Sequence, residues 1–462
     1  MSAGDVFTDL GFISLLLLIG TLLRAKVRAL QALFLPASLI AGILGLVFGP
    51  NGLGWIPFSE SLSGYSGILI AIVFAALPFT SQLDGFAKAA KHVATTWALS
   101  QSIVLLQWGL GLLFSLSVIA LIFVNLDIPD GFGLMLAAGF MGGHGTAAAL
   151  AEVFGDQWPA AQSLGMTAAT LGIVVSVIGG ILLIKLESQR GGTAYLRSFA
   201  DLPTPMRTGI VPEERRESVG DAPVSSMSID PLIYHAGLVI GIGGVSALVA
   251  TRLGEWLGGL SIPTFSVSFL IGFAVLFLLR ALRVWQNFDP RLIERTSGSA
   301  TDLLVAFGIA AIDPAVVVDY AAPLALLLAF GALVVLAFYF FVAKRGFSDH
   351  PVEQSLFLWG WNTGTVAMGI ALLRIVDPNM KSKTLDYYGI AYVPIGFVDI
   401  ATIALLPVLV MSGAAWPTAL VLVGVGLALL LGRFVLTPRR ARSVSPRRRG
   451  SSNRTTSHAP QG

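Results

Sequence analysis

Long apolar runs recur along the whole chain, and most are close to the length of a membrane-spanning helix. A helix needs about 20 predominantly apolar residues to cross the hydrocarbon core of a bilayer. Several runs contain glycine, which is common where membrane helices pack closely. The pattern predicts an all-α polytopic membrane protein. Its eleven candidate spans are 6–23, 33–49, 68–79, 97–124, 163–184, 232–250, 263–279, 303–312, 321–342, 387–411 and 415–435.

Two further segments, 131–154 and 355–376, are apolar but interrupted by glycine and polar residues. Hydropathy alone leaves open whether they cross the membrane or re-enter on the same side. Lysine and arginine favour the cytoplasmic side, and they distinguish the two topologies. If both segments are re-entrant, all 29 lysines and arginines except Arg252 lie inside. If 131–154 crosses, the basic central linker moves outside. The charges therefore favour a re-entrant hairpin in each half.

Both ends of the chain are predicted from their charge. The first run is a retained helix rather than a signal peptide, because its flank MSAGDVFTDL lacks basic residues and Arg24, Lys26 and Arg28 follow it. This places the N-terminus outside. An extra span at 413–437 places the C-terminus in the cytoplasm. The basic stretch 438–462 is typical of a disordered tail. Contact with anionic lipid is plausible there, whereas no nucleic acid is expected, since no folded basic domain accompanies the tail.

Composition supports the same class and excludes others. Hydrophobic residues make up 55% of the 462 residues and charged residues 12%, about half of the roughly 25% usual for a soluble domain. The mean hydropathy is +0.81. A water-soluble enzyme of this size has no means of burying so much apolar surface. The chain has no cysteine, which excludes disulfides, thiolate metal sites and cysteine nucleophiles.

The spans form two halves with matching features. We predict a first repeat at 1–186 and a second at 229–412, joined by a polar cytoplasmic linker at 187–228. In each half the second span opens with proline and the third is unusually short, at 68–79 and 303–312. Five spans per half is an odd number, so the second half enters from the opposite face. Broken segments at equivalent places in two inverted repeats indicate the binding site of a secondary transporter.

The first broken segment carries the motif GGHGTAAA at 142–149. Gly142, Gly143 and Gly145 permit positive-φ turns and close approach of the backbone. Thr146 and the alanines that follow restart a helix, whose free N–H groups suit a carboxylate. We therefore predict a substrate site here. The alternative is a glycine-packed helix crossing that binds no ligand.

The second broken segment carries GWNTGT at 360–365. Gly360 and Gly364 are predicted to break the helix, and Asn362, Thr363 and Thr365 offer neutral oxygen and amide groups. We predict that Asn362, Thr363, Gly364 and Thr365 bind substrate and that Asn362, Thr365 and Asp399 bind sodium. Asp399 lies in an apolar run, where a carboxylate is costly and indicates function. The alternatives are simple capping of the restarted helix and a structural hydrogen bond of Asp399.

Two other polar residues lie at membrane depth. His144 is predicted to bind substrate at the first loop, and a neutral histidine bonded to a backbone carbonyl is an equal alternative. Gln107 is an amide in an apolar span, where bonding between helices is as plausible as a functional role. An intramembrane enzyme would need a nucleophile beside His144, and only Ser163 or Ser176 is available for that role. The histidines are scattered, so no histidine metal site is predicted.

These motifs resemble the glutamate–sodium symporter family of bacteria. The resemblance rests on GGHGTAAA, on IPTF at 262–265 and on VPIGFVDI at 393–400, and it runs from about residue 6 to about 412. It implies that residues 142–146 lie in the first family loop and Asp399 in the last family span. It also implies sodium-coupled uptake of an acidic amino acid, a homodimer and an elevator-like movement.

One departure from the family pattern leaves the substrate open. The second family loop is richer in glycine, whereas here only Gly360 and Gly364 match and Trp361 adds bulk. The predicted function is a sodium-coupled glutamate symporter of the bacterial cytoplasmic membrane, with sodium as coupling ion and no cofactor. The alternative is a cation-coupled carrier of another small organic anion. A channel is less consistent, because two inverted broken loops suit alternating access better than a permanent pore.

Overall fold

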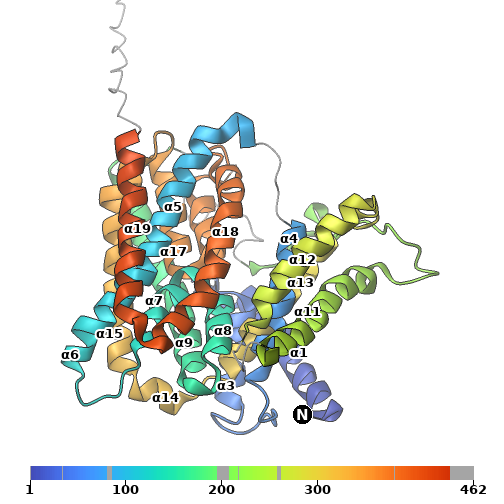
Figure 1. The fold of residues 1–462 in the computed structure, drawn as a ribbon. Helices are drawn as coiled ribbons and strands as arrows, with labels where there is room; N and C mark the ends of the chain where they lie inside the picture. Colours follow the sequence, from blue (N-terminus) through green and yellow to red (C-terminus); the bar gives the residue numbers. More distant parts are fainter. Residues whose placement is uncertain are drawn as a thin grey trace, which may run out of the picture.

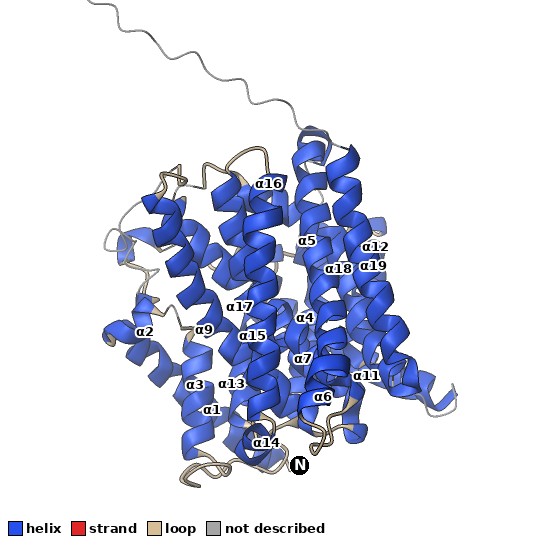
Figure 2. Ribbon diagram, turned by 90° about the vertical axis from the view of Figure 1, so that its left-hand side faces the viewer, coloured by secondary structure: helices blue, strands red, loops and turns tan. Residues whose placement is uncertain are grey.

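In the computed structural model, the chain is an assembly of helices, and the residues that it describes contain no strand (Figure 2). These residues are 2–33, 35–80, 86–194, 208–216, 218–256, 262–378 and 380–436. The predicted tail and part of the predicted linker lie outside them. Nine of the described helical segments are long and apolar enough to cross a membrane. The chain is a multi-pass membrane protein.

The helices follow the predicted spans in order. Those of the first half are α1 (Ala3–Lys26), α2 (Arg28–Ala32), α3 (Ala37–Phe48), α4 (Gly64–Thr80), α5 (Phe86–Phe114), which continues through a π turn (Ser115–Ile119) into α6 (Ala120–Ile122), α7 (Leu134–Ala137), a second π turn (Ala138–Gly142), α8 (Gly143–Phe154) and α9 (Ala160–Gln189). Those of the second half are α11 (Pro231–Trp256), α12 (Thr264–Ala281), α13 (Pro290–Ala310), α14 (Pro314–Asp319), α15 (Ala321–Ala337), α16 (Lys344–Gly346), α17 (Pro351–Val376), α18 (Thr384–Leu409) and α19 (Ala415–Leu436).

The helices pack into two groups, which Figure 1 shows side by side. The scaffold consists of α1, α3, α4, α11, α12 and α13. The core consists of α5, α7, α8, α9, α15, α17, α18 and α19. Helix α8 belongs to the core but also packs on α4 and α13, so it lies where the two groups meet. The scaffold presents apolar side chains outward, such as Leu248, Leu270 and Phe277, as expected of helices that face lipid.

The predicted short span at 303–312 is wrong. Helix α13 begins at Pro290 and is 21 residues long. Asp289 caps it by accepting a hydrogen bond from the Arg291 N–H at 2.9 Å, and proline suits the first helical position. The first half of α13 buries Leu292 while its opposite face is polar. Hydropathy averaged over such an amphipathic segment therefore missed the start of the helix.

Candidate functional site

Each broken segment stays helical on both sides of one sharp break. In the first, Gly143 has φ 65° and ψ −163°. In α17, Gly364 and Thr365 leave the helical region, and Thr365 has φ 76° and ψ 167°. This extended region of positive φ is essentially restricted to glycine. A β-branched residue held there stores about 1–3 kcal/mol of strain, which is typical of functional sites.

The breaks turn each helix back on itself. A Cβ atom added to Gly131, at the start of the first segment, would lie 2.7 Å from the Phe154 ring at its end. An unbroken helix would separate these residues by about 35 Å. In α17, a Cβ atom on Gly369 would lie 2.7 Å from the Phe357 carbonyl oxygen. Each segment therefore has two arms joined at a tip.

The first tip (142–146) and the second tip (362–365) touch each other. A Cβ atom on Gly143 would lie 2.3 Å from Cγ2 of Thr365. Only glycine at position 143 leaves room for the threonine methyl group. The structure thus brings together two sets of predicted site residues that are more than 200 positions apart in the sequence.

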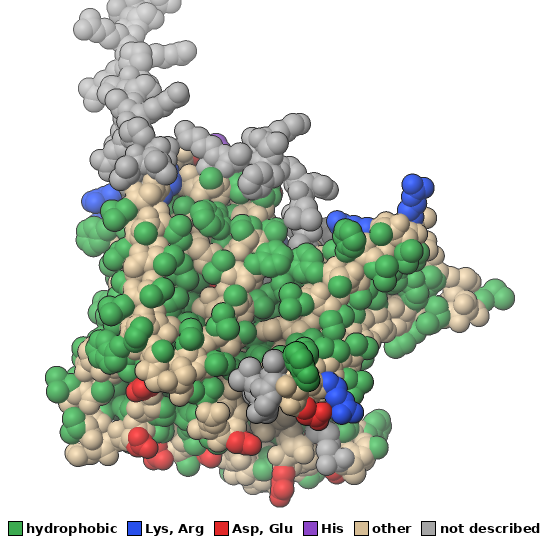
Figure 3. Space-filling model, in the orientation of Figure 1, with side chains coloured by type: hydrophobic (Ala, Val, Ile, Leu, Met, Phe, Trp, Pro, Cys, Tyr) green, Lys and Arg blue, Asp and Glu red, His purple; other side chains and the backbone are tan. Residues whose placement is uncertain are grey.

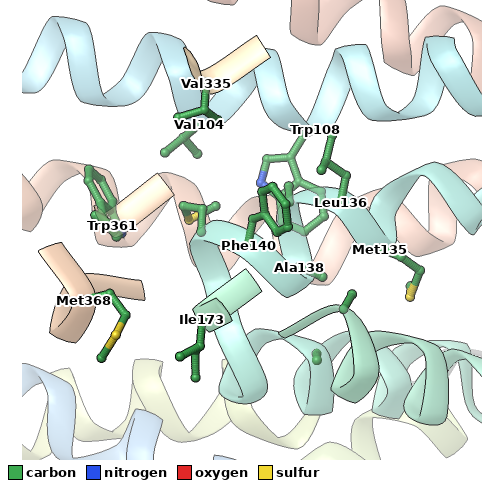
Figure 4. Packing of buried hydrophobic residues seen from close by; sticks show 14 of the residues in the cluster. Val104, Trp108, Met135, Leu136, Ala138, Phe140, Ile173, Val335, Trp361 and Met368 are labelled. Atoms are coloured by element: carbon green, nitrogen blue, oxygen red, sulfur yellow. The ribbon is translucent and has the colours of Figure 1, made fainter. Parts of the chain in front are cut away.

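Large apolar side chains pack around the tips. Trp108 of α5, Phe140 of the first segment and Trp361 of α17 are each at most 1% exposed. Figure 4 shows them with Ile173 and Met368 in the same buried cluster. Packing at this density resists small displacements. The arms therefore hold the tips in fixed positions.

His144 anchors the first tip to α9. It is 4% exposed, and its Nε2 lies 3.1 Å from Thr170 Oγ1. The Thr170 hydroxyl donates to the Met166 carbonyl oxygen at 2.9 Å, so its oxygen accepts from the His144 ring. His144 is therefore bonded to a side chain and not to a backbone carbonyl. Sequence reasoning missed Thr170, since nothing distinguishes one threonine within an apolar span.

The other first-tip groups are more accessible. Gly142, Gly145 and Thr146 are partly exposed, and the Thr146 hydroxyl makes no hydrogen bond to a described residue. Gly145 faces α4, where an added Cβ atom would lie 3.3 Å from Cδ1 of Ile70. The first tip therefore borders the scaffold.

Asn362 and Thr363 have side chains already bonded within the protein. Both are fully buried. Asn362 Nδ2 donates to the Leu358 carbonyl oxygen at 2.9 Å, and Thr363 Oγ1 donates to the Trp359 carbonyl oxygen at 2.7 Å. Gln107 Nε2 donates to both the carbonyl oxygen and Oδ1 of Asn362, at 3.1 and 3.0 Å. Gln107 thus joins α5 to the second tip. Of the two roles considered for Gln107 from the sequence, this is bonding between helices.

Gly364 and Thr365 differ from their neighbours in this tip. A Cβ atom on Gly364 would lie 2.5 Å from Cβ of Ser176 on α9, so Gly364 permits close packing there. Thr365 is partly exposed, and its hydroxyl makes no hydrogen bond to a described residue. Thr365 is therefore the side chain of this tip that is free to take a ligand.

Asp399 lies on α18 and is 7% exposed, with its Oδ1 buried and without a hydrogen-bond partner among the described residues. Tyr388 and Tyr392 lie on the same face of α18, and both rings pack against Trp361, with centroids 4.9 and 6.2 Å apart. The stacking of His92 on Tyr387 aligns α5 with α18. Counting the helical rise from that pair puts Asp399 within about one turn of the depth of Gln107.

No three histidine, aspartate or glutamate side chains gather to hold a metal ion within the part of the chain that the structure describes. The tips bring together backbone N–H and carbonyl groups instead. The restarted arms point their N-terminal N–H groups, and the first arms their C-terminal carbonyl groups, toward one junction. Such a junction can bind an anion and a small cation side by side.

Comparison with known proteins identifies the family of the chain. A family model described as sodium/glutamate symporter matches residues 5–349. The match includes the first tip and ends just before α17, so the second tip and Asp399 lie beyond it. No curated protein matches the chain.

One of the similar solved structures is the sodium–proton antiporter MjNhaP1 of Methanocaldococcus jannaschii at pH 8. It has 20% identity and a TM-score of 0.39, over 91% of this chain and 100% of that chain. Because the family model matches most of the chain, the chain belongs to the sodium/glutamate symporter family and is a cation-coupled membrane transporter.

Proposed function

We propose that the protein couples sodium entry to the uptake of glutamate, with the core moving against the scaffold in an elevator-like manner. The observation that carries the proposal is the contact of the two tips at Gly143 and Thr365. The junction lies between buried helices, where unpaired backbone groups are tolerated only if they line a cavity or bind a ligand.

The chemistry of the junction suits both ligands. The N-terminal turns of α8 and of the second arm of α17 supply N–H groups for the carboxylates of glutamate. The partly exposed hydroxyls of Thr146 and Thr365 add neutral oxygens. Asp399 supplies a hard carboxylate for sodium at nearly the same depth. Asn362 and Thr363 shape the second tip through their bonds to its own backbone.

Helix pairing supports the inverted repeat. α3 packs on α13 in the same way as α12 packs on α4, and α1 packs on α3 as α11 packs on α12. The second helix of each half therefore packs on the third helix of the other half. The fold-back contacts of Gly131 and Gly369 support a re-entrant hairpin in each half.

Charge supports the orientation. Figure 3 shows Lys and Arg side chains mainly at the upper end of the molecule and Asp and Glu side chains at the lower end. Positive residues favour the cytoplasm, so we place the upper end, with the linker and the C-terminus, inside and the N-terminus outside. Arg252, the one basic residue predicted outside, pairs with Glu255 at 3.1 Å. A homodimer in the cytoplasmic membrane without enzymatic activity remains our prediction.

A carrier of another small organic anion is the second candidate. It is favoured by the second tip, which lies beyond the residues matched by the family model and reads GWNTG. Because the side chains of Asn362 and Thr363 are already bonded to α17 and to Gln107, this tip offers one free hydroxyl, that of Thr365. An anion that is smaller or less polar than glutamate would need no more than this one hydroxyl from the second tip.

Reconstitution tests the function. Purified protein in proteoliposomes should accumulate labelled glutamate under an inward sodium gradient and not under a potassium gradient. Unlabelled aspartate, malate and citrate are added as competitors to rank the anions. The Gly143→Val variant is the control for leak, since it blocks the contact between the tips. Uptake that does not depend on the sodium gradient overturns the coupling. Sodium-driven uptake of another labelled anion, in the absence of glutamate uptake, selects the second candidate.

A further inference from the structure

Helix α13 presents a polar face at membrane depth. Arg291 in its first turn pairs with Asp289 and with Asp221 of the linker. From Glu294 to Ala310, every exposed residue of this helix is polar or glycine: Glu294, Arg295, Gly298, Ser299, Thr301 and Asp302. They cover about 12 Å of helical rise, less than half of the roughly 30 Å hydrocarbon thickness. The neighbouring helices α11 and α12 expose Leu248, Leu270 and Phe277 instead. Lipid suits those side chains but not the face of α13.

Helix α3 packs on the outer half of α13 only, and the linker lies on the first turn, where a Cβ atom on Gly220 would lie 2.6 Å from Cγ of Leu292. Helix α3, predicted over 33–49, is helical only from Ala37 and spans about 18 Å. Its Gly42 abuts Ile309, with an added Cβ atom 2.6 Å from the isoleucine Cβ, and its Gly45 abuts Ala310. Above Ala37 no part of α3 continues along α13. The polar face is therefore left uncovered by α3 toward the cytoplasmic end.

Helices α9 and α13 meet at their outer ends. A Cβ atom on Gly308 would lie 2.6 Å from Cε of Met166, and the Asp313 N–H donates to Ser163 Oγ at 3.0 Å. Toward the other end, the core and the scaffold diverge, as Figures 1 and 3 show. The two groups thus touch at their outer ends and are further apart toward the end that carries the Lys and Arg side chains.

The first tip lies where the two groups meet. Met166 accepts the hydrogen bond of Thr170, which in turn holds His144. Gly145 faces Ile70 of α4, and α8 packs on both α4 and α13. A solute that leaves the first tip toward the cytoplasm therefore passes along α13.

We propose that the polar face of α13 lines a water-filled vestibule that is open to the cytoplasm in this structure and carries the small anionic cargo between the tips and the cell interior. The proposal rests on the proposed function for its direction and its cargo. It assigns a role to the exposed polar residues of α13 between Glu294 and Asp302.

Thiol labelling tests the vestibule, because the natural chain has no cysteine. Ser299→Cys and Thr301→Cys are treated with a membrane-impermeant cationic methanethiosulfonate in inverted and in right-side-out vesicles. The controls are Leu270→Cys on the apolar face of α12, Leu304→Cys, which is buried, and Ser225→Cys in the linker. We expect positions 299 and 301 to react in inverted vesicles within about tenfold of the linker control, and both membrane controls about 100-fold more slowly, since thiolates form in water and not in lipid.

The outcomes are distinct. Slow labelling of both α13 positions overturns the vestibule, and disulfide-linked pairs of chains at position 299 under an oxidant overturn it in favour of a second copy on this face. Labelling only in right-side-out vesicles overturns the cytoplasmic opening. Attachment of a bulky reagent at 299, but not at 225, should block sodium-driven uptake, and unchanged uptake would remove the cargo from this route. Absence of glutamate uptake with normal labelling overturns the proposed substrate alone.

Discussion

The two tips have similar backbone conformations at Gly143 and Thr365, but one position is glycine and the other is a β-branched residue. Gly143 adopts the positive-φ extended conformation without steric cost, whereas Thr365 adopts it with a side chain. The threonine methyl occupies the space that the missing Cβ of Gly143 leaves open. The strain at Thr365, about 1–3 kcal/mol, is therefore the cost of a side chain that contacts the other tip. The residues at the two breaks are therefore complementary in size rather than identical.

The tips also differ in how they are held. The first tip is tied to α9 by the His144–Thr170 hydrogen bond and borders the scaffold through Gly145. The second tip is tied to α5 by Gln107, and its first arm is tied to α9 by Ser176, whose hydroxyl donates to the Gly360 carbonyl oxygen at 3.1 Å. The second tip is thus fixed within the core, while the first tip faces the surface against which the core would move.

Placing a threonine at both tips should have the largest effect. In Gly143→Thr, two side chains compete for one space and a second residue is strained, so we expect glutamate uptake below about 1% of the natural protein. Uptake is measured in proteoliposomes and scaled to the amount of folded protein. The exchange variant Gly143→Thr/Thr365→Gly restores one side chain and one gap, and it should recover part of the activity. Near-normal uptake by Gly143→Thr alone would contradict the contact between the tips.

Gln107 tests whether the second tip needs its tie to α5. Gln107→Leu leaves two buried acceptors of Asn362 unpaired, which costs about 1–3 kcal/mol. We expect a lower thermal midpoint in detergent and slower uptake. The matched control is Gln101→Leu on the same helix, because Gln101 is 2% exposed and its amide makes no hydrogen bond to a described residue. Equal effects of the two substitutions would show that Gln107 acts only as a buried amide.

Asp399 tests whether the nearby carboxylate serves the tips. Asp399→Asn keeps the shape and one oxygen but removes the negative charge. If Asp399 binds sodium, the sodium concentration for half-maximal uptake should rise about tenfold, while substrate affinity at saturating sodium changes less. Substrate affinity at low sodium must then fall, because the binding of the two ligands is linked. An unaltered sodium curve in correctly folded protein would leave Asp399 with a structural role.

Thr365→Gly should have the smallest effect, and the sign of its change in thermal midpoint is informative. The substitution removes strain of about 1–3 kcal/mol but adds about 0.4–1 kcal/mol of chain entropy to the unfolded state. We therefore expect a higher thermal midpoint together with weaker substrate binding, since the free hydroxyl is lost. Thr146→Gly is the control: its backbone is helical, so glycine there should lower the midpoint. A lower midpoint for both variants would argue against strain at Thr365.

Much of the fold was predictable because it depends on local composition. The apolar runs predicted the helices, and the glycine-rich motifs predicted a break in each half. The breaks lie at Gly143 and at Gly364 with Thr365, whereas the predicted break at Gly360 is wrong because that residue stays helical. The start of α13 was not predictable from averaged hydropathy, since half of that helix is polar. Periodicity would have found it, because Leu292 and Ala300 recur on one buried face.

The site was predictable as a set of residues but not as a set of contacts. Nothing in the order of the chain says that Gly143 meets Thr365 or that Thr170 holds His144, since these contacts depend on the packing of distant helices. The sequence also gives no sign that the Asn362 side chain is used within its own helix. Polar residue types at a helix break indicate a site, whereas their hydrogen-bond partners decide which of them remain free.

Helix α19 packs along α5, with Gly109 against Val423 and Gly426 against Leu106. Arg433 near its end donates to the Gly346 carbonyl oxygen at 2.7 Å, which ties it to α16 as well. Helix α19 is therefore fixed to the other helices of the core. If the core moves across the membrane during transport, the end of α19 moves with it. A fluorophore attached there would then change its depth relative to the lipid headgroups in each transport cycle. Any protein or lipid that binds the end of α19 and restrains it would slow uptake without contacting the binding site.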